Sequence, residues 1–578
     1  MPTTQTGGFQ VTGKNATALF TLKIHRGDGM CLLAMNWKKG QPPKDFVGFG
    51  IEYKEPGGQK FFALKNRLSF AGADPNDPNR LLSTRSPFQK FRWVHFPRNA
   101  SMEGDFMYRV TPVFMNQLGE LSNGEFQEAA IQLRRDTYPG KVNVAFTRGF
   151  VSSQSFVDRY QTATEGIPQL LPPNSKAGLA FIPSHSKKDD AYIWMGFESR
   201  EIILELLDNA IKDKKATVRV IAYDLNEPGI VTRLEALGDR LRVIIDEDGE
   251  HGVTGSAENA AATRLRISAG TKNVKRQHMG KLQHNKTIIV DGPKVKSVVC
   301  GSTNFSWWGF FIQANNAFQI NGKKAVDVFG AAFESYWVNK NDTGLFGKTS
   351  SAIWNDLTFY DINMQVSFSP HGSANAALQS IADDIKTKTT GSLFYSLAFL
   401  HLTGKGAINE AINAVTNDPA IFVYGMSDLK NGGIQILKPD GNLAPVKSSE
   451  LTEANTPEPF KSEPTGGKGP RLHHKFVVID FDKPTARVYM GSYNFSGAAD
   501  RTNGENLLMI KDRRIAVSYM IEGLRLFDHY HFRVKQEEAA TAVDKLELKK
   551  PPKLPGETAW WEEYYNVNNK IADRKLFA

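Results

Sequence analysis

The sequence predicts an α/β protein in which two similar halves follow an all-β module. A run of alternating strand-like and helical segments occurs twice in the same order, and each run leads to a nearly identical string of polar residues. The N-terminal quarter of the chain instead contains short strand-like runs between turns rich in Gly, Pro and Asp. Because alternating strands and helices form sheets covered by helices, we expect two α/β sandwich halves packed with approximate symmetry.

The all-β module is predicted for residues 1–150. Its strand-like runs are residues 18–25, 31–37, 46–53, 59–64, 106–114, 129–134 and 142–150. Short strands at this spacing are typical of a β-sandwich of the immunoglobulin or fibronectin type. No polar motif in this region carries chemistry, so we expect an accessory module that binds another protein.

The two α/β halves are predicted for residues 151–345 and 346–578. The first reads as helix, strand, helix and strand over residues 202–207, 216–223, 230–237 and 241–246. The second repeats this order over residues 377–385, 392–400, 408–415 and 420–424. A further helix follows the polar string of each half, at residues 326–338 and 517–534. The shared order indicates that the two polar strings occupy equivalent places.

Each polar string begins with a His and a Lys, two residues apart, at the start of an apolar strand. They are His284 and Lys286 before residues 287–290, and His473 and Lys475 before residues 476–479. Successive side chains of a strand point to opposite faces, so residues two apart share a face. Each His and its Lys can therefore contact the same ligand.

A second apolar strand in each half brings further polar residues back to the same place. A short turn joins the two strands, and the second strand ends in Gly-Ser-x-Asn-Phe-Ser. The returning residues are Ser302 and Asn304 in the first half and Ser492 and Asn494 in the second. We expect these neutral side chains to bind phosphate oxygens beside the His and Lys.

This combination of residues suits attack on a phosphodiester. The reaction needs a nucleophile, an acid for the departing alkoxide and positive charge near the phosphoryl oxygens. Imidazole changes protonation state near neutral pH, so two of them supply the nucleophile and the acid, and two lysines supply the charge. Zinc ligation is disfavoured, since the chain has two Cys and no His-x-x-x-His near the strings. We expect neither a metal nor a cofactor.

The repeated string, His-x-Lys followed by Asp291 or Asp480 and then by Gly-Ser-x-Asn, resembles the HKD motif of the phospholipase D superfamily. The resemblance covers the chain from about residue 176 to about residue 540 and implies that both halves form one active site. It also implies a covalent phosphohistidine: one of His284 and His473 attacks phosphorus, and the other protonates the leaving group. Water or another alcohol then releases the phosphoryl group, while Asp291 and Asp480 support the motif from outside the site.

In many members of that superfamily a Glu eleven residues after the motif Asn orients a motif His. Glu505 holds this position in the second half, whereas the first half has Asn315. We therefore expect Glu505 to support His473 and Asn315 to face His284. A carboxylate adds basicity to the imidazole and an amide only orients it, so the halves should differ chemically, and the division of roles between the two His stays open.

The composition favours a folded protein with an anionic partner. Of 578 residues, 41% are hydrophobic and 23% are charged, and the formal net charge is +10. This excess suits nucleic acid, an acidic membrane surface or a small phosphodiester. Four basic residues before the first string either belong to a solvated loop or steer phosphate toward the site. They are Lys272, Lys275, Arg276 and Lys281.

The expected compartment follows from the cysteines and the N-terminus. Cys31 and Cys300 are expected to be free thiols, which fits a reducing compartment. The chain shows neither a signal-peptide pattern nor an apolar run of membrane-spanning length. We expect a cytoplasmic protein without a transmembrane segment, with secretion without a leader left open and peripheral membrane contact as one mode of substrate access.

Two further segments allow alternative interpretations. Residues 447–470 are rich in Pro, Ser, Gly and charge, which indicates either a surface insertion or a lid over the site. The C-terminal aromatics Trp560, Trp561, Tyr564 and Tyr565 either pack against the second half, as we expect, or contact a membrane interface.

The leading hypothesis is a metal-independent phosphodiesterase of phospholipase D type that cleaves a phospholipid by hydrolysis or by transfer to another alcohol. A nuclease that uses the same His and Lys residues on DNA or RNA is the first alternative. A catalytically weakened scaffold, with the N-terminal module as its binding surface, is the second, and Asn315 in place of an acidic residue is its support.

Overall fold

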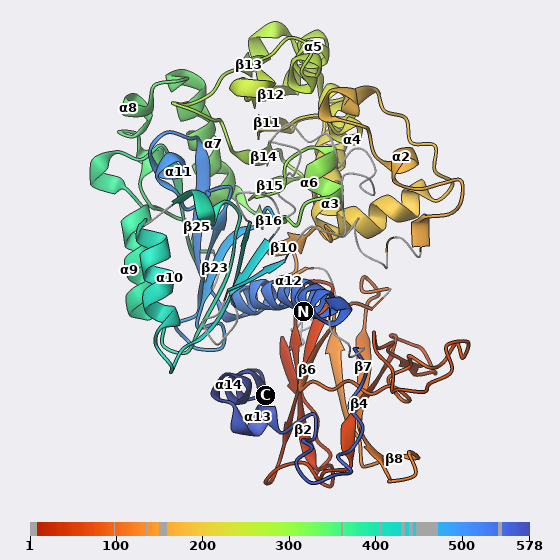
Figure 1. Ribbon diagram of the computed structural model, residues 1–578. Helices are drawn as coiled ribbons and strands as arrows, with labels where there is room; N and C mark the ends of the chain where they lie inside the picture. The colour runs from red at the N-terminus through yellow and green to blue at the C-terminus, as the bar shows by residue number, and fades with distance from the viewer. Residues whose placement is uncertain are drawn as a thin grey trace, which may run out of the picture. The chain divides into compact units, whose positions relative to one another are not determined.

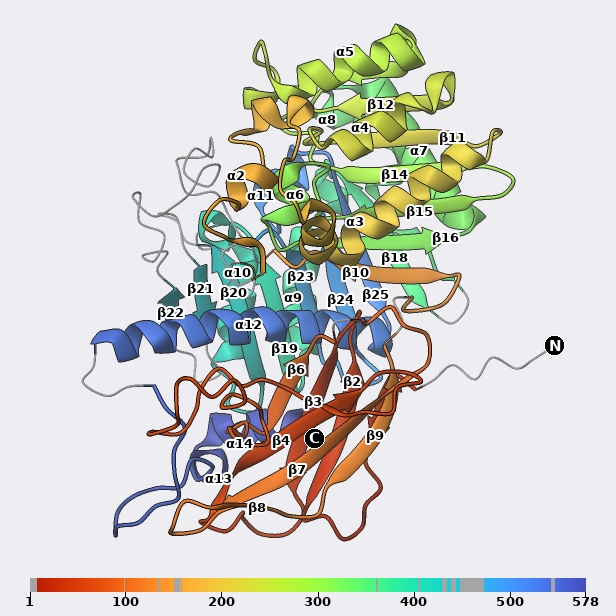
Figure 2. The same ribbon diagram turned by 90° about the vertical axis from the view of Figure 1, so that its right-hand side faces the viewer.

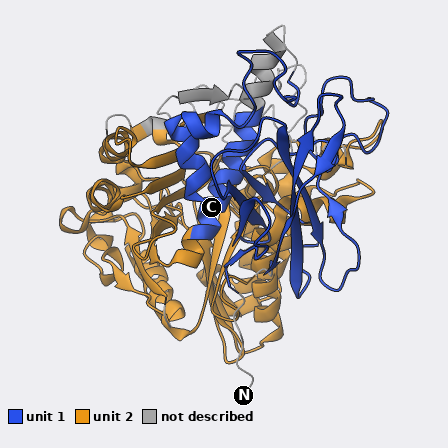
Figure 3. Ribbon diagram, turned by 90° about the horizontal axis from the view of Figure 1, so that it is seen from below, with its two compact units in different colours: residues 1–135, 517–578 blue, residues 136–516 orange. Residues whose placement is uncertain are grey.

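The computed structural model describes residues 8–97, 99–133, 136–149, 156, 159–359, 362–403, 406–428, 434–437, 443–446, 472–541 and 546–578. The chain forms two compact units, residues 1–135 with 517–578, and residues 136–516 (Figure 3). In the described ranges no helix has the length and apolar character needed to cross a membrane. The segment expected to be a lid or an insertion, residues 447–470, lies outside the described residues.

The first unit contains two antiparallel sheets (Figure 1), with the orders β1-β2-β3-β6 and β5-β4-β7-β8 and with β9 also paired to β7. The strands are β1 (Gln10–Thr12), β2 (Phe20–Arg26), β3 (Cys31–Trp37), β4 (Phe46–Lys54), β5 (Phe62–Ala63), β6 (Arg92–His95), β7 (Asp105–Met115), β8 (Leu121–Asn123) and β9 (Gln127–Gln132). Phe20 and Leu33 of one sheet share a core with Phe49 and Tyr108 of the other. The all-β module is confirmed, while its immunoglobulin or fibronectin type stays a prediction.

The C-terminal aromatic residues belong to the core of this first unit. Trp560, Trp561 and Tyr564 are buried in it, and Nε1 of Trp560 donates a hydrogen bond of 3.0 Å to the carbonyl oxygen of Phe46. The helices here are α13 (Glu563–Asn566) and α14 (Asn568–Leu576). The expected packing of these aromatics against the second half is wrong, because the β-sheets offer both an apolar surface and an acceptor for the indole N–H.

The second unit contains two sheets whose central strands follow one pattern. Their orders are β10-β16-β15-β14-β11-β12-β13 and β17-β18-β25-β24-β23-β19-β20-β21-β22. In the first sheet the motif strand β14 lies antiparallel between β15 and β11, and β11 pairs in parallel with β12. In the second sheet the motif strand β23 lies antiparallel between β24 and β19, and β19 pairs in parallel with β20. The two α/β halves predicted from the repeat are confirmed.

The strands of the first half are β10 (Val142–Phe146), β11 (Thr217–Ala222), β12 (Leu241–Ile245), β13 (Val274–Arg276), β14 (Lys286–Asp291), β15 (Lys296–Gly301) and β16 (Asn316–Asn321). Those of the second are β17 (Asn355–Asp356), β18 (Asn363–Ser369), β19 (Ser392–Leu397), β20 (Phe422–Asp428), β21 (Ile434–Leu437), β22 (Leu443–Val446), β23 (Lys475–Ile479), β24 (Arg487–Gly491) and β25 (Glu505–Lys511).

Helices cover these sheets and bury their apolar residues. They are α2 (Ile167–Leu170), α3 (Lys188–Lys212), α4 (Pro228–Glu235), α5 (Ala257–Ala269), α6 (Trp307–Phe311), α7 (Lys323–Asn339), α8 (Thr343–Phe346), α9 (Leu378–Lys388), α10 (Ala407–Thr416) and α11 (Gly497–Arg501). Helix α12 (Arg513–Thr541) starts at the end of this unit, and its residues from 517 onward belong to the first unit. Figure 2 shows α3, α4 and α5 in front of the first sheet, with which they share a core. Helices α9 and α10 share a core with the second sheet.

Strand β10 belongs to the first sheet. It pairs antiparallel with β16, and all of its residues are buried, while β18 holds the equivalent place beside β25. The expectation that residues 142–150 form a strand of the N-terminal module is therefore wrong. A strand buried on both faces lacks alternation, so its sequence does not indicate which sheet it joins. The predicted domain limits at residues 150 and 345 refer to units that fold independently. Strand pairing alone does not define such units, so these limits stay proposals.

Candidate active site

The two motif His-Lys pairs meet in one place. Lys286 and Lys475 are the first residues of β14 and β23, so His284 and His473 lie just before the two motif strands. Both imidazole side chains are only 4% exposed and both lysines are buried. The ring centroids of His284 and His473 are 6.4 Å apart. The structure therefore brings together the four residues that the sequence predicts to be catalytic.

Each motif His is held by the orienting residue of the opposite half. Nδ1 of His284 lies 2.8 Å from Oε2 of Glu505, and Nδ1 of His473 lies 2.8 Å from Oδ1 of Asn315. The expected pairing, Glu505 with His473 and Asn315 with His284, is therefore wrong. The two orienting residues are the expected ones, but their partners are exchanged.

Two isolated β-bridges explain this exchange. Gln283, next to the first motif His, bridges to Gly504, next to Glu505. Ala314, next to Asn315, bridges to Leu472, next to the second motif His. Each bridge joins the segment that leads into the motif strand of one half, β14 or β23, to the segment that leads into the last strand of the other half, β25 or β16. Sequence proximity favours partners within one half, and no residue pattern marks these bridges.

The motif serines bind the orienting residues. The hydroxyl of Ser492 donates to Oε2 of Glu505 at 2.7 Å, and the hydroxyl of Ser302 donates to Oδ1 of Asn315 at 3.0 Å. A serine has one O–H donor, so in this geometry neither hydroxyl has a proton left for a phosphate oxygen. The two serines therefore position Glu505 and Asn315 in this structure, and their expected binding of phosphate oxygens stays a prediction.

The motif asparagines and lysines retain capacity for a ligand. Oδ1 of Asn304 and Oδ1 of Asn494 are buried and have no hydrogen-bond partner within the described ranges. Buried polar atoms are normally paired, so these two unpaired amide oxygens are consistent with a site completed by a ligand that donates an N–H or O–H group. Nζ of Lys286 donates to the carbonyl oxygen of its own motif His, as does Nζ of Lys475, which holds both ammonium groups beside the imidazoles.

The motif glycines let each strand end close to its neighbour. Gly301 and Gly491 have φ of 134° and 149°, a backbone region that favours glycine. A Cβ atom at Gly491 would lie 2.2 Å from the carbonyl oxygen of Asn506. Glycine at this point therefore lets Ser492, the next residue, approach the last strand and reach its orienting residue.

We expect Gly491→Ala to lower the free energy of unfolding by about 2 kcal/mol or more, because the methyl group meets backbone and the φ angle is strained. Gly497→Ala is the matched control, since nothing lies within 4 Å of a Cβ atom at Gly497. Urea denaturation of both variants measures the difference. Equal midpoints would show that the backbone relaxes at no cost.

The Asp of each motif lies at the far end of its strand. Asp291 ends β14 and forms an ion pair with Lys296. Asp480 follows β23, is buried, and accepts hydrogen bonds from the backbone N–H groups of Gly391 and Ser392. Both residues act on the fold outside the site: one pairs across the hairpin, and the other secures the start of β19.

Burial determines the charge state of the site. It lowers the pKa of His284 and of His473 well below the usual imidazole value, and the lysines beside them lower both further. It also raises the pKa of Glu505 to about 7 and lowers the pKa of Lys286 to about 8. A bound phosphoryl group adds negative charge beside the imidazoles, which favours the protonated form that a general acid needs.

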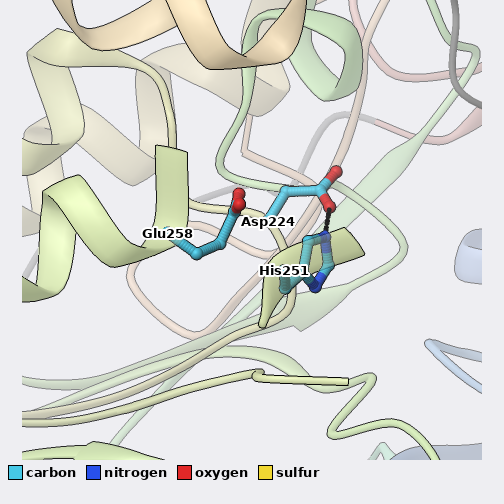
Figure 4. A group of neighbouring side chains, drawn as sticks. All are labelled: Asp224, His251 and Glu258. Atoms are coloured by element: carbon cyan, nitrogen blue, oxygen red, sulfur yellow. Dashed lines mark ion pairs between the residues drawn. The ribbon is translucent and has the colours of Figure 1, made fainter. Parts of the chain in front are cut away.

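A network of charged residues borders the first half of the site, and Figure 4 shows three of them, Asp224, His251 and Glu258. Nε2 of His251 lies 3.1 Å from Oδ1 of Asp224, and its Nδ1 lies 2.8 Å from Oδ2 of Asp246. Burial lowers the pKa of His251, but these two carboxylates outweigh burial and raise the pKa to about 10. Asp246 also accepts the backbone N–H of Gln283 through Oδ1, so the network holds the segment that leads into His284.

Asp224, His251 and Glu258 offer donor atoms within 4.8 Å of one another, a set that a metal ion could use. Both ring nitrogens of His251 contact carboxylates, which suits an imidazolium that neutralises them. Sequence reasoning missed these residues. Asp224 lies two residues beyond β11, and a carboxylate at a strand end beside the motif strand was the signal that could have found it.

Two of the basic residues expected to steer phosphate have structural contacts. Arg276 donates from Nη2 to the carbonyl oxygens of Asp246 and His251, and Nζ of Lys275 donates to the carbonyl oxygen of Trp337. Lys272 and Lys281 are exposed. The steering interpretation therefore extends at most to these two lysines.

Two α/β halves of one topology, each presenting a His and a Lys at the start of a central strand, define a phospholipase D-like protein. The chain contains a phospholipase D-like domain: the family model described as "Cardiolipin synthase, PLD-like domain" matches residues 191–337 and 433–522. The match consists of two segments, one around each motif, as the repeat predicts.

Similar sequences carry the name "Phospholipase D". That of Rickettsia bellii (strain RML369-C) is 32% identical over 125 residues, which are 20% of this chain and 58% of the relative. That of Rickettsia felis (strain ATCC VR-1525 / URRWXCal2) is 46% identical over 48 residues, 8% of this chain and 22% of the relative. The chain therefore spans less than two thirds of the length of these curated relatives.

Similar solved structures include phosphatidylserine synthase from Haemophilus influenzae Rd KW20, which is 11% identical with a TM-score of 0.37 and covers 65% of this chain and 93% of that one. Nuc from Salmonella typhimurium, a phospholipase D family member, is 27% identical with a TM-score of 0.20 and covers 25% of this chain and 89% of that one.

Proposed function

We propose that this chain is a phosphodiesterase that cleaves a phospholipid through a covalent phosphohistidine, without a metal ion. The observation that carries the proposal is the facing pair of buried imidazoles, 6.4 Å apart between ring centroids and each held at Nδ1 by the opposite half. Holding Nδ1 leaves Nε2 of each ring as the reacting nitrogen. His284, His473, Lys286 and Lys475 are the proposed catalytic residues.

The proposed reaction has two steps. Nε2 of one imidazole attacks phosphorus, the bond from phosphorus to the alcohol oxygen breaks, and the other imidazole gives its proton to the departing alkoxide. Water then attacks the phosphohistidine, gives its proton to the second imidazole and restores the first. The two lysines stabilise negative charge on the phosphoryl oxygens in both steps. In a transfer reaction another alcohol takes the place of water.

The phospholipid is proposed because the relatives above are called phospholipase D. DNA or RNA is the second candidate, since the net charge of +10 suits a polyanion. The all-β module is proposed to bind another protein.

Phosphatidylethanolamine vesicles and plasmid DNA, each incubated with the purified chain with and without EDTA, test these proposals together. We expect phosphatidic acid from the vesicles at the same rate in EDTA, and intact DNA. Cleavage of DNA alone would favour the nuclease, and cleavage of neither would favour the weakened scaffold. Loss of activity in EDTA would contradict the metal-independent mechanism.

We expect kcat/KM to fall above about pH 8. Burial lowers the pKa of Lys286 to about 8, so this side chain is charged below that pH and loses its charge, and its attraction for a phosphodiester, as the pH rises through it. A profile of kcat/KM reports the free enzyme. Lys286→Arg, whose guanidinium stays charged, should move the fall to higher pH, and an unchanged profile in that variant would assign the fall to another group.

A further inference from the structure

The two sides of the active site differ at one equivalent position. In the first half Ala222 of β11 pairs with Lys286, and in the second half Leu397 of β19 pairs with Lys475. Two residues farther along the chain stand Asp224 and Phe399. The position beside one motif pair therefore carries a carboxylate, and the same position beside the other carries a phenyl ring.

The Phe399 side is apolar. Its ring centroid lies 6.3 Å from that of His473, and Nζ of Lys475 lies 6.0 Å from the same centroid. On the opposite side Tyr223 packs between the two histidines of the first half, with centroid distances of 4.7 Å to His284 and 4.4 Å to His251. On this first side, Tyr223 therefore lies between His284 and the ion pair that His251 forms with Asp224.

Asp224 is accessible and can accept further hydrogen bonds. Its side chain is 20% exposed, whereas that of His284 is 4% exposed. Its described contacts are the ion pair with His251 and a hydrogen bond of 3.2 Å from the hydroxyl of Ser306. A carboxylate has about four acceptor positions, so a ligand that carries N–H or O–H groups can still bind here.

Several carboxylates lie on this side of the site. Burial raises the pKa of Tyr223 well above its usual value, and the charges of Asp224, Asp246 and Glu258 raise it further. The positive charges that oppose these carboxylates beside Asp224 are those of His251 and Lys286. A second phosphate near Asp224, as the neighbouring nucleotide of a DNA or RNA substrate would supply, meets repulsion, whereas an ammonium group meets attraction.

Resting on the phospholipid cleavage proposed above, we propose that Asp224 selects phosphodiesters whose alcohol carries a primary ammonium group, as in phosphatidylethanolamine. A primary ammonium donates three hydrogen bonds to oxygen acceptors, whereas the quaternary ammonium of choline donates none. Phe399 then lies beside the glyceride arm of the diester. The two halves share one framework, and the difference between Asp224 and Phe399 at the equivalent position is what distinguishes the two ester arms of the substrate.

The test compares kcat/KM for phosphatidylethanolamine, phosphatidylcholine and phosphatidylmethanol with identical acyl chains in mixed micelles. We expect wild type to prefer the ethanolamine lipid over the methanol lipid by about tenfold or more, as a charge-assisted hydrogen bond implies. Asp224→Asn should reduce this ratio about tenfold. Asp291→Asn is the matched control and should keep the ratio, since Asp291 contacts Lys296 at the far end of β14.

Three outcomes would overturn the assignment. A wild-type ratio near one, or a ratio that Asp224→Asn leaves unchanged in a variant with the wild-type melting temperature, contradicts the ammonium subsite while phospholipid cleavage stands. Equal rates on the ethanolamine and choline lipids, both reduced by Asp224→Asn, contradict recognition through N–H donors. Cleavage of no lipid at all removes the proposed function and this subsite together.

Discussion

We expect His284→Ala and His473→Ala each to lower kcat by about three orders of magnitude or more, because nucleophile and general acid act as one unit. The double variant should lose little more than either single variant. The measurement is release of ethanolamine from phosphatidylethanolamine vesicles, with circular dichroism to establish that each variant is folded. Both rings are buried and face each other, so removal of either one leaves a single motif imidazole in the site.

His278→Ala is the matched control for this pair. His278 contacts the side chain of Asn341 and the carbonyl oxygen of Met279 rather than the motif residues, so its removal should leave kcat within about twofold. Quenching turnover with a labelled phosphoryl group assigns the roles, since the nucleophile is the His that retains label when the other is replaced. If either site variant keeps wild-type turnover, the two-imidazole mechanism is wrong.

Glu505→Gln should lower kcat about 100-fold and should act through His284. The carboxylate oxygens of Glu505 lie 2.8 and 2.9 Å from Nδ1 of His284. The amide keeps the shape of the side chain but removes the charge that supports a positive imidazole, and loss of such an orienting partner typically costs 10 to 100-fold in activity. The imidazole ¹⁵N resonances of His284 should shift in this variant, while those of His473 should stay near their wild-type positions.

Asn315→Ala provides the reciprocal measurement. Oδ1 of Asn315 lies 2.8 Å from Nδ1 of His473, so this variant should shift the resonances of His473 and spare those of His284. If Glu505→Gln instead perturbed His473, each half would orient its own histidine and the exchange between halves would be refuted. The two variants together separate the exchanged arrangement from the one that sequence proximity favours.

Local pattern predicted most of the fold of the two halves. Apolar runs of strand length and helical periodicity placed β11, β12, β19 and β20 and the helices between them close to their observed bounds. The alternation of side chains on a strand predicted that each motif His and Lys face one ligand. The sheet to which β10 belongs was not predicted correctly, because the sequence of a strand buried on both faces does not indicate which sheet it joins.

By itself, the sequence determined the two-half architecture, the resemblance to phospholipase D and the four catalytic candidates, because these depend on spacing along one strand and on a motif that occurs twice. Only the tertiary structure decided which orienting residue serves which histidine, that the motif serines act on Glu505 and Asn315, and that Asp224 borders one side and Phe399 the other. These contacts join residues from separate segments, and they arise when the two sheets close on each other. The spacing of residues along the chain does not indicate how the two sheets close on each other. The asymmetry of the site is therefore a property of the folded pair of halves.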